Sequence, residues 1–279
     1  MSPVSPKELL SEWSLRPKHH FGQNFLSNPD LVEKIAKQVV QGQGGTVIEI
    51  GAGLGALTCA LLIQATRVIG IERDRELIPV LRHVFSEAID SGKLVLVEED
   101  AKTTDYCHLF EAAPEPHVLT GNLPYQLTGP LLRRAVELSE VIQRAVFMVQ
   151  LEVADRLCAQ PSHPEYGALT VFVQACYSVR RVFTVGRGAF YPQPRVDSAI
   201  VELIPLRPRI SDETPLFRGL VQRAFQQRRK MLRNAWKGMP EVSGIDLANA
   251  ATRAGINLDS RGETLSVLEF SRMAAELGS

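Results

Sequence analysis

The stretch Val47-Ile-Glu-Ile-Gly51-Ala-Gly53-Leu-Gly55-Ala56 decides the fold class. It places a glycine-rich turn between an apolar run that is typical of a buried strand and a segment of helical character. Glycines permit a tight turn and let a ligand approach the backbone closely. The stretch therefore predicts an adenosine-containing cofactor at the carboxyl end of this strand.

Three acidic residues refine the predicted cofactor site. Glu72 ends the next predicted strand, where a carboxylate can accept hydrogen bonds from both ribose hydroxyls. Asp100 follows the third strand and can accept a hydrogen bond from the exocyclic amine of adenine. Glu49 lies inside an apolar strand, where it either orients the loop amides, meets the ammonium group of a methionine moiety, or reaches solvent. The same pattern serves nicotinamide dinucleotides and S-adenosylmethionine (SAM), so these residues leave the cofactor open.

Strands and helices alternate on both sides of this turn. The patterns predict strands at 46–50, 67–71, 93–97, 118–120 and 145–149, and helices at 29–40, 57–64, 76–89 and 130–138. Asn28 is a suitable N-cap for the helix that begins at Pro29. Strands separated by crossover helices predict an α/β fold with a mostly parallel sheet.

The last third of the chain changes character. Segments 169–178 and 199–204 are rich in β-forming residues, which predicts an antiparallel hairpin that completes the sheet. Residues 204–209 resemble a linker, and the pattern from residue 215 onwards is helical. We therefore predict a first domain over residues 1–205, beginning with a loose arm, and a small helical domain over residues 206–279.

Composition excludes several classes of protein. The chain has 279 residues, of which 45% are hydrophobic and 22% charged, as expected for a folded protein with a sizeable core. No apolar run approaches the roughly 20 residues of a membrane-spanning helix, and the N-terminal residues lack an apolar signal-peptide core. We therefore expect a cytoplasmic protein without a membrane partner. The four scattered cysteines predict reduced, mostly buried thiols, and the histidine spacing predicts no metal site.

The charge is distributed unevenly along the chain. The totals are 31 basic and 31 acidic residues, but the stretch from Arg218 to Lys237 holds seven basic residues and no acidic one. As one continuous helix, this stretch would have an apolar stripe opposite a basic side, with Arg228 inside the stripe. Either the helix breaks near Gln226–Gln227, or Arg228 is buried with a partner. The basic side is either a solvated face or a surface that contacts RNA phosphates.

The turn Asn122-Leu123-Pro124-Tyr125 follows the fourth predicted strand, at the edge of the sheet where open α/β proteins place reacting groups. The N6 amine of adenine is a poor nucleophile because its lone pair is delocalised into the ring. An asparagine oxygen and a neighbouring backbone carbonyl can accept both amine hydrogens and so direct the lone pair towards an activated methyl group. Proline stiffens the turn, and tyrosine offers a stacking face for an extruded base.

Five motifs together resemble a known family. They are Phe21-Gly-Gln-Asn-Phe-Leu26, Glu49-Ile-Gly-Ala-Gly-Leu-Gly55, Asn122-Leu-Pro-Tyr125, Phe190-Tyr-Pro-Gln-Pro-Arg-Val-Asp-Ser-Ala199 and Gln227-Arg-Arg-Lys-Met-Leu-Arg-Asn234. In this order they resemble the small-subunit ribosomal RNA adenine dimethyltransferases (KsgA/RsmA), from about residue 17 to the C-terminus. The resemblance implies a class I (Rossmann-like) SAM-dependent methyltransferase domain. It also implies dimethylation of N6 on two adjacent adenosines in a hairpin loop near the 3′ end of that RNA.

The resemblance also implies roles for individual residues. The family's cofactor contacts fall on Asn24, Leu26, Gly51, Glu72, Asp100 and Asn122. The glycine loop adds Glu49 and Gly53 to this predicted cofactor site. The catalytic set comprises Asn122, Leu123, Pro124 and Tyr125, with Phe190 against the target base opposite Tyr125. The predicted RNA contacts are Arg228, Arg229, Lys230 and Arg233. The pair His19-His20 departs from the basic or small residues expected there, which clouds the role of this arm towards RNA.

Three other functions share part of this pattern. A large-subunit rRNA adenine methyltransferase of the antibiotic-resistance type shares the core, although the segments 190–199 and 227–234 favour the small-subunit branch. A nicotinamide oxidoreductase shares the glycine loop but leaves Asn122 to Tyr125 unexplained. A non-catalytic ribosome-assembly protein would bind RNA without turnover. The favoured prediction is a monomeric enzyme that acts on rRNA within a pre-assembled small subunit.

Overall fold

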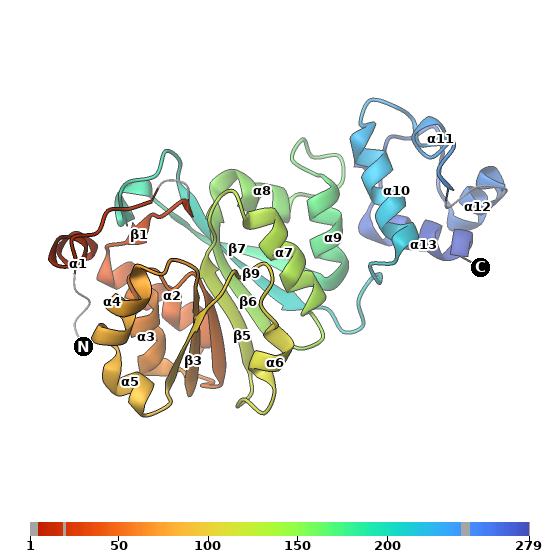
Figure 1. Cartoon of the computed structure of the whole chain (residues 1–279). Coiled ribbons are helices and arrows are strands. Elements are labelled where there is room, and N and C mark those ends of the chain that lie inside the picture. The colour runs from red at the N-terminus through yellow and green to blue at the C-terminus, as the bar shows by residue number, and fades with distance from the viewer. Residues whose placement is uncertain (1–4, 19–20, 241–245, 279) are drawn as a thin grey trace. The chain divides into compact units, whose positions relative to one another are not determined.

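The computed structural model of the chain describes residues 5–18, 21–240 and 246–278 (Figure 1). The chain divides into two compact units, Met1–Ala154 with Arg180–Ile204, and Asp155–Val179 with Pro205–Ser279. The chain passes into the second unit at Asp155, returns to the first at Arg180, and enters the second again at Pro205. The last of these crossings lies next to the predicted boundary after residue 205. Residues 155–179, which the sequence assigned to the first domain, belong to the second unit. Within the described residues, no helix is long and apolar enough to cross a membrane.

A sheet with the strand order β4-β3-β2-β5-β6-β9-β7 organises the first unit. Its strands are β2 (Thr46–Ile50), β3 (Arg67–Glu72), β4 (Leu94–Glu98), β5 (His117–Asn122), β6 (Arg144–Gln150), β7 (Tyr177–Val185) and β9 (Ser198–Pro205). The pairs from β4 to β6 are parallel, and β9 runs antiparallel to β6. The mostly parallel α/β sheet predicted from the sequence is therefore confirmed. The strand order reverses between β2 and β5, and open α/β sheets bind ligands at such a switch point.

Helices connect these strands. They are α2 (Pro29–Val40), α3 (Ala56–Gln64), α4 (Leu77–Val84), α5 (Ser86–Asp90), α6 (Tyr106–Phe110), α7 (Thr128–Glu137) and α8 (Leu151–Cys158), with the 3-10 turn η2 (Arg187–Ala189) after β7. Asn28 caps α2 as predicted, because its side-chain oxygen accepts the backbone N–H of Leu31 at 3.0 Å. The predicted helix over 76–89 is divided at Phe85, whose backbone leaves the helical conformation. A core cluster joins Val39 of α2 and Leu61 of α3 to the sheet residues Val68 and Val146.

The N-terminal segment is more ordered than the predicted loose arm. Helix α1 (Pro6–Glu12) buries Leu9 and Leu10 in a cluster with Phe25, Leu54 and Leu77. Farther along, β1 (Phe25–Leu26) pairs antiparallel with β8 (Phe190–Tyr191), so that Leu26 lies opposite Phe190. Apolar burial therefore fixes a segment that its prolines had marked as loose.

The second unit is helical. Its elements are α9 (Ala168–Cys176), α10 (Pro215–Gln226), α11 (Leu232–Ala235), α12 (Leu247–Ala254), α13 (Val267–Gly278) and the 3-10 turn η4 (Gly262–Thr264). Trp236 is fully buried, and its indole N–H donates to the Leu220 carbonyl at 3.0 Å. Of the four cysteines in the chain, only Cys176 is buried, so the prediction of mostly buried thiols is wrong.

The strand predicted at 169–178 is wrong over most of its length, because α9 occupies it up to Cys176. Thr170, Val171 and Val173 favour strands locally, since they are β-branched. Their helix is instead stabilised by packing against α10 and α13. The ring of Phe172 meets Phe217 of α10 edge-on, with centroids 6.2 Å apart. Tertiary contacts have overridden local propensity here.

Candidate active site

A cavity of about 350 Å³ lies in the first unit at the carboxyl ends of β2, β3 and β5. Its lining comes from three places: the segment 21–26, the glycine turn after β2, and the residues that end the neighbouring strands. All eight predicted cofactor residues line this cavity: Asn24, Leu26, Glu49, Gly51, Gly53, Glu72, Asp100 and Asn122. The structure thus brings together residues that span almost a hundred positions of the sequence.

The glycine turn is held by its own amides. Gly51 and Gly53 have φ angles of +74° and +60°, which side chains rarely tolerate. A Cβ at Gly53 would lie 3.2 Å from the ring of Phe25, whereas the space around Gly51 is open. The amides of Gly51 and Ala52 donate to the Ile71 carbonyl, and that of Gly53 donates to a Glu72 carboxylate oxygen at 2.8 Å. The turn therefore presents a fixed, closely approachable wall to the cavity.

Glu72 is fixed as firmly as the turn. Its side chain is 8% exposed, and its carboxylate accepts the backbone N–H groups of Gly53, Arg73 and Asp74, each at 2.8 Å. Burial raises the pKa of Glu72, and these three hydrogen bonds oppose that rise. The carboxylate has one defined orientation at the edge of the cavity, as recognition of a diol requires.

Glu49 does not reach solvent at the strand end, which corrects that alternative. It is 2% exposed, and the hydroxyl of Thr58 donates to it at 2.6 Å. Burial, with a smaller contribution from the nearby Glu72 charge, raises the pKa of Glu49 to about 8. Glu49 is therefore mainly protonated at neutral pH when the cavity holds no compensating cation.

Asp100 pairs with two basic side chains. Its carboxylate lies 3.1 Å from the Arg73 guanidinium and 3.5 Å from the Lys102 ammonium, and it accepts the Lys102 N–H at 3.0 Å. Arg73 also lines the cavity, and sequence reasoning missed it. Its position directly after Glu72 was the available signal.

Asn122 ends β5 at the rim of the cavity. Its side-chain N–H donates to the backbone carbonyl of Asn24 at 3.0 Å. The side-chain oxygen therefore points away from Asn24 and can accept a hydrogen bond from another group. The Pro124 carbonyl accepts from the Leu127 N–H at 2.8 Å and from the Thr128 hydroxyl at 3.2 Å. Asn122 therefore joins the end of β5 to the segment 21–26.

Comparisons with known proteins agree with this arrangement. The family model described as "Ribosomal RNA adenine dimethylase" matches residues 15–278. The chain is 39% identical, over 98% of both chains, to "Ribosomal RNA small subunit methyltransferase A" of Anaeromyxobacter sp. (strain K). The chain belongs to the ribosomal RNA adenine dimethylase family.

Solved structures show the same fold. A dimethyladenosine transferase from Plasmodium falciparum superposes with a TM-score of 0.73 at 27% identity, over 89% of this chain and 95% of the other. The 23S rRNA methyltransferase ErmE superposes with a TM-score of 0.66 at 24% identity, over 92% of this chain and all of the other, and shows the shared fold. The first unit of this dimethylase is thus a class I SAM-dependent methyltransferase fold, as predicted.

Of the remaining predicted catalytic residues of the dimethylase, only Pro124 lines the cavity. The Leu123 side chain is 1% exposed and belongs to the core. Tyr125 is half-buried outside the cavity lining, and a hydrogen bond joins its hydroxyl to Ser198. Phe190 is 6% exposed and packs in the core cluster that contains Leu26, so the structure does not bring its ring to the cavity. The stacking roles of Tyr125 and Phe190 stay predictions.

The basic residues of the second unit fall into two groups. Helix α10 ends at Gln226, so the helix breaks before Arg228, which was one of the two predicted alternatives. Arg228 is partly exposed and donates to Glu263 at 2.8 Å and to the carbonyls of Pro164 and Tyr166. Arg233 pairs with Asp259 at 2.5 Å.

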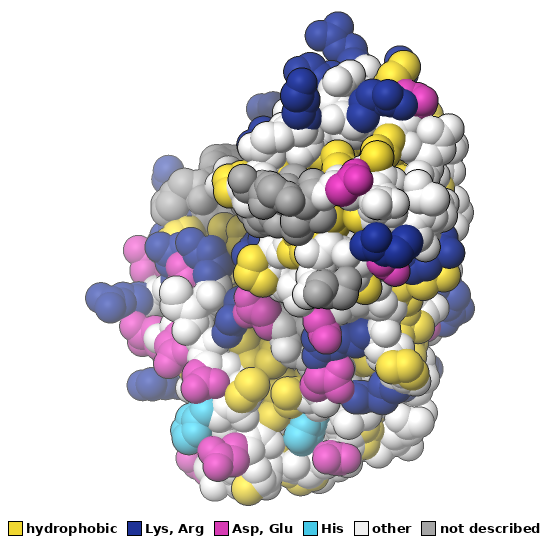
Figure 2. Space-filling view, turned by 90° about the vertical axis from the view of Figure 1, so that its right-hand side faces the viewer, with side chains coloured by type: hydrophobic (Ala, Val, Ile, Leu, Met, Phe, Trp, Pro, Cys, Tyr) yellow, Lys and Arg dark blue, Asp and Glu magenta, His cyan; other side chains and the backbone are white. Residues whose placement is uncertain are grey.

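Arg229 and Lys230 are exposed, and their side chains form no ion pair with the described part of the chain. On the face drawn in Figure 2, basic side chains predominate at the top of the view, and basic and acidic ones are intermixed below them. The predicted RNA contacts are therefore two exposed cations beside two ion-paired arginines. The residues His19 and His20 lie outside the described part of the chain.

Proposed function

We propose that this dimethylase transfers methyl groups from SAM to N6 of two adjacent adenosines in a hairpin loop near the 3′ end of small-subunit rRNA. The observation that carries the proposal is the convergence of the glycine turn, Glu72, Asp100 and Asn122 on one cavity. The name of the Anaeromyxobacter relative favours the small subunit over the large one. We further propose that the enzyme is a cytoplasmic monomer and that it acts on rRNA within a pre-assembled small subunit.

The lining fits SAM better than a dinucleotide. A pyrophosphate requires backbone N–H groups that point at it. In this turn the amides of Gly51, Ala52, Gly53 and Gly55 all donate to acceptors within the protein. The cavity lining also includes the carboxyl groups of Glu49 and Glu72, the second of which is an anion held by three backbone N–H groups; they disfavour a phosphate and suit a cationic ligand, which would favour the ionised form of Glu49. When bound, SAM supplies a methyl group activated by its sulfonium.

The chain's own residues orient the amine. The Asn122 side-chain oxygen accepts one N6 hydrogen, since its N–H is held by Asn24. The Pro124 carbonyl is occupied by two donors, so we assign the second acceptor to the carbonyl of Leu123. Two acceptors draw the nitrogen lone pair out of conjugation and aim it into the cavity. No strong base is needed, and catalysis rests on orientation and electrostatics.

Methyl transfer to unmethylated subunits tests the proposal. Purified protein is incubated with tritiated SAM and either small or large ribosomal subunits that lack the modification, and the products are mapped by mass. We expect N6,N6-dimethyladenosine at two adjacent positions of the small-subunit RNA. Labelling of the large subunit instead would support the antibiotic-resistance type of enzyme. Tight binding without any labelling would support a non-catalytic assembly protein.

A further inference from the structure

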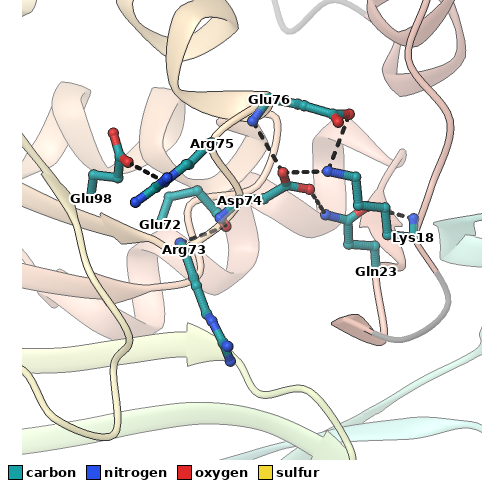
Figure 3. A network of polar contacts seen from close by, with 8 residues as sticks. All are labelled: Lys18, Gln23, Glu72, Arg73, Asp74, Arg75, Glu76 and Glu98. Atoms are coloured by element: carbon teal, nitrogen blue, oxygen red, sulfur yellow. Dashed lines mark hydrogen bonds and ion pairs between the residues drawn. The ribbon is translucent and has the colours of Figure 1, made fainter.

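The segment 21–26 forms one wall of the cavity and also carries the Asn24 carbonyl that holds Asn122. One end of this wall is fixed by the β1–β8 pairing at Phe25 and Leu26. The other end, from Phe21 to Asn24, belongs to no strand within the described residues. It is instead held by a cluster of polar side chains that meet at Asp74, just after β3 (Figure 3).

Asp74 is built into this position. Its side chain is 3% exposed, and its carboxylate accepts the Lys18 ammonium at 2.6 Å and the Gln23 amide at 2.7 Å. The Gln23 side chain also accepts the backbone N–H of Lys18 at 2.8 Å, which closes a ring of contacts. Burial alone would raise the pKa of Asp74, but the hydrogen bonds from Lys18, the Glu76 N–H and Gln23 hold it below its usual range. Asp74 is thus a buried, fully partnered anion.

The same residue is bonded to the opposite side of the cavity. The backbone N–H of Asp74 donates to Glu72, whose other oxygen accepts the Gly53 N–H. A continuous path therefore runs from Glu72 through Asp74 to Gln23, and along the chain to Asn24 and Asn122. The path links the residue proposed to bind the cofactor ribose with the one proposed to hold the target amine.

We propose that Asp74 is a positioning residue of the dimethylase: by clamping Lys18 and Gln23, it sets the place of the segment 21–26 against both the cofactor and Asn122. This inference rests on the proposed function for its effect on catalysis. The clamp residues Asp74, Lys18 and Gln23 lie outside the predicted catalytic, cofactor-binding and RNA-binding sets. Neither Asp74 nor Lys18 lines the cavity, so their influence passes through the segment that they hold.

The consequence of removing the clamp follows from its chemistry. Asp74→Asn removes the nearer and more buried of the two carboxylates that pair with Lys18, the other being Glu76 at 3.1 Å, while the shape of the side chain is retained. A hydrogen bond to a charged group is worth about tenfold to a hundredfold in an equilibrium constant. We expect SAM affinity to fall by about tenfold, and the single-turnover methylation rate at saturating SAM to fall by a similar factor. Lys18→Met, which alters a side chain that is 24% exposed, should reproduce both effects without creating a buried vacancy.

A neighbouring ion pair provides the matched control. Arg75 pairs with Glu98 at 3.0 Å, is 89% exposed, and points away from the segment 21–26 (Figure 3). Arg75→Gln therefore removes one cation next to Asp74 in the sequence without touching the clamp. It should leave SAM affinity, methylation rate and thermal unfolding unchanged.

A double-mutant cycle separates positioning from general destabilisation. If Asp74 acts on the reaction through Asn24 and Asn122, Asp74→Asn should slow methylation about tenfold in the native background but less than twofold in Asn122→Ala. Equal slowing in both backgrounds, or no slowing in the native one, would overturn the inference.

The exchange rates of backbone amides test whether the clamp holds the segment, independently of catalysis. The Phe21 and Gln23 amides donate to the Lys18 carbonyl, and they should exchange faster in Asp74→Asn but not in Arg75→Gln. Unchanged exchange would also overturn the inference. Failure of the native protein to methylate any subunit would instead contradict the proposed function, and the exchange measurement would still decide whether the clamp exists.

Discussion

Asn122 donates its side-chain N–H to the backbone carbonyl of Asn24 across 3.0 Å, although the two residues are 98 positions apart. The contact fixes which end of the asparagine amide faces the cavity. A side chain at a strand end would otherwise rotate freely between presenting a donor and presenting an acceptor. Only the acceptor orientation can take a hydrogen from the amine of adenine. The N-terminal segment therefore contributes to the reaction geometry as well as to the cofactor wall.

This relationship predicts the behaviour of two substitutions at the same position. Asn122→Ala should slow methyl transfer about a hundredfold to a thousandfold, the range found when one positioning group is removed. Asn122→Asp keeps an acceptor but lacks the donor to Asn24, so it should also be strongly impaired. Binding of the small subunit should stay near native, because phosphate contacts dominate that affinity. Single-turnover methylation at saturating SAM, with a binding isotherm alongside, measures both quantities. A wild-type rate in Asn122→Ala would mean that the segment 122–125 is only a turn.

The cofactor prediction follows from the amides of the glycine turn. Because they are occupied by Ile71, Glu72 and Ala52, we expect SAM and its demethylated product to bind, and NAD to bind at least a hundredfold more weakly. Calorimetry with the three ligands measures this difference. Tight NAD binding without SAM binding would show that the turn accommodates a pyrophosphate after all.

Much of this site could be predicted from sequence because its signals are local. The helix from Pro29 begins where a capping asparagine and a first-turn proline both place it. The glycine turn and Glu72 lie at adjacent strand ends, and a parallel sheet brings such ends to one edge. These features depend on a few neighbouring residues and on one topological rule.

The features that the sequence does not reveal depend on partners that are distant in sequence. The burial of Phe190 is one of them, because it is set by the pairing of Phe190 with Leu26 and by the core cluster that both residues join. The clamp between Asp74 and Lys18 likewise joins two loops, and neither loop carries a pattern that identifies the other. Helix α9 is stabilised by packing against α10 and α13. The sequence of residues 168–176 alone does not indicate these contacts.

Glu49 predicts a dependence of stability on pH. Its pKa is about 8 in the folded protein and 4.5 in the reference state, so the folded state binds a proton that the unfolded state has released between these values. Stability from this group is fully present below pH 4.5 and is lost as the pH rises through 8. Glu49→Gln mimics the protonated form and should raise the melting temperature at pH 8 relative to the native protein, by about 2–4 °C for each kcal/mol gained. The advantage should vanish near pH 5. Thermal melts of both proteins from pH 5 to 9, without ligand, measure it, and parallel curves would contradict the burial of an ionisable Glu49.

The basic residues after α10 predict a dependence of RNA binding on salt. Arg229 and Lys230 are exposed and without ion-pair partners in the described chain, whereas Arg233 is paired with Asp259. If phosphates bind here, replacing Arg229 and Lys230 with Gln should reduce the slope of log affinity against log salt by roughly 0.7–0.9 for each cation removed. Arg233→Gln should reduce it less, because its charge is already partly neutralised. SAM affinity should not change, since these residues lie outside the cavity lining. Filter binding to small subunits at several salt concentrations measures the slopes, and an unaltered slope in the double variant would mean that these cations form a solvated face.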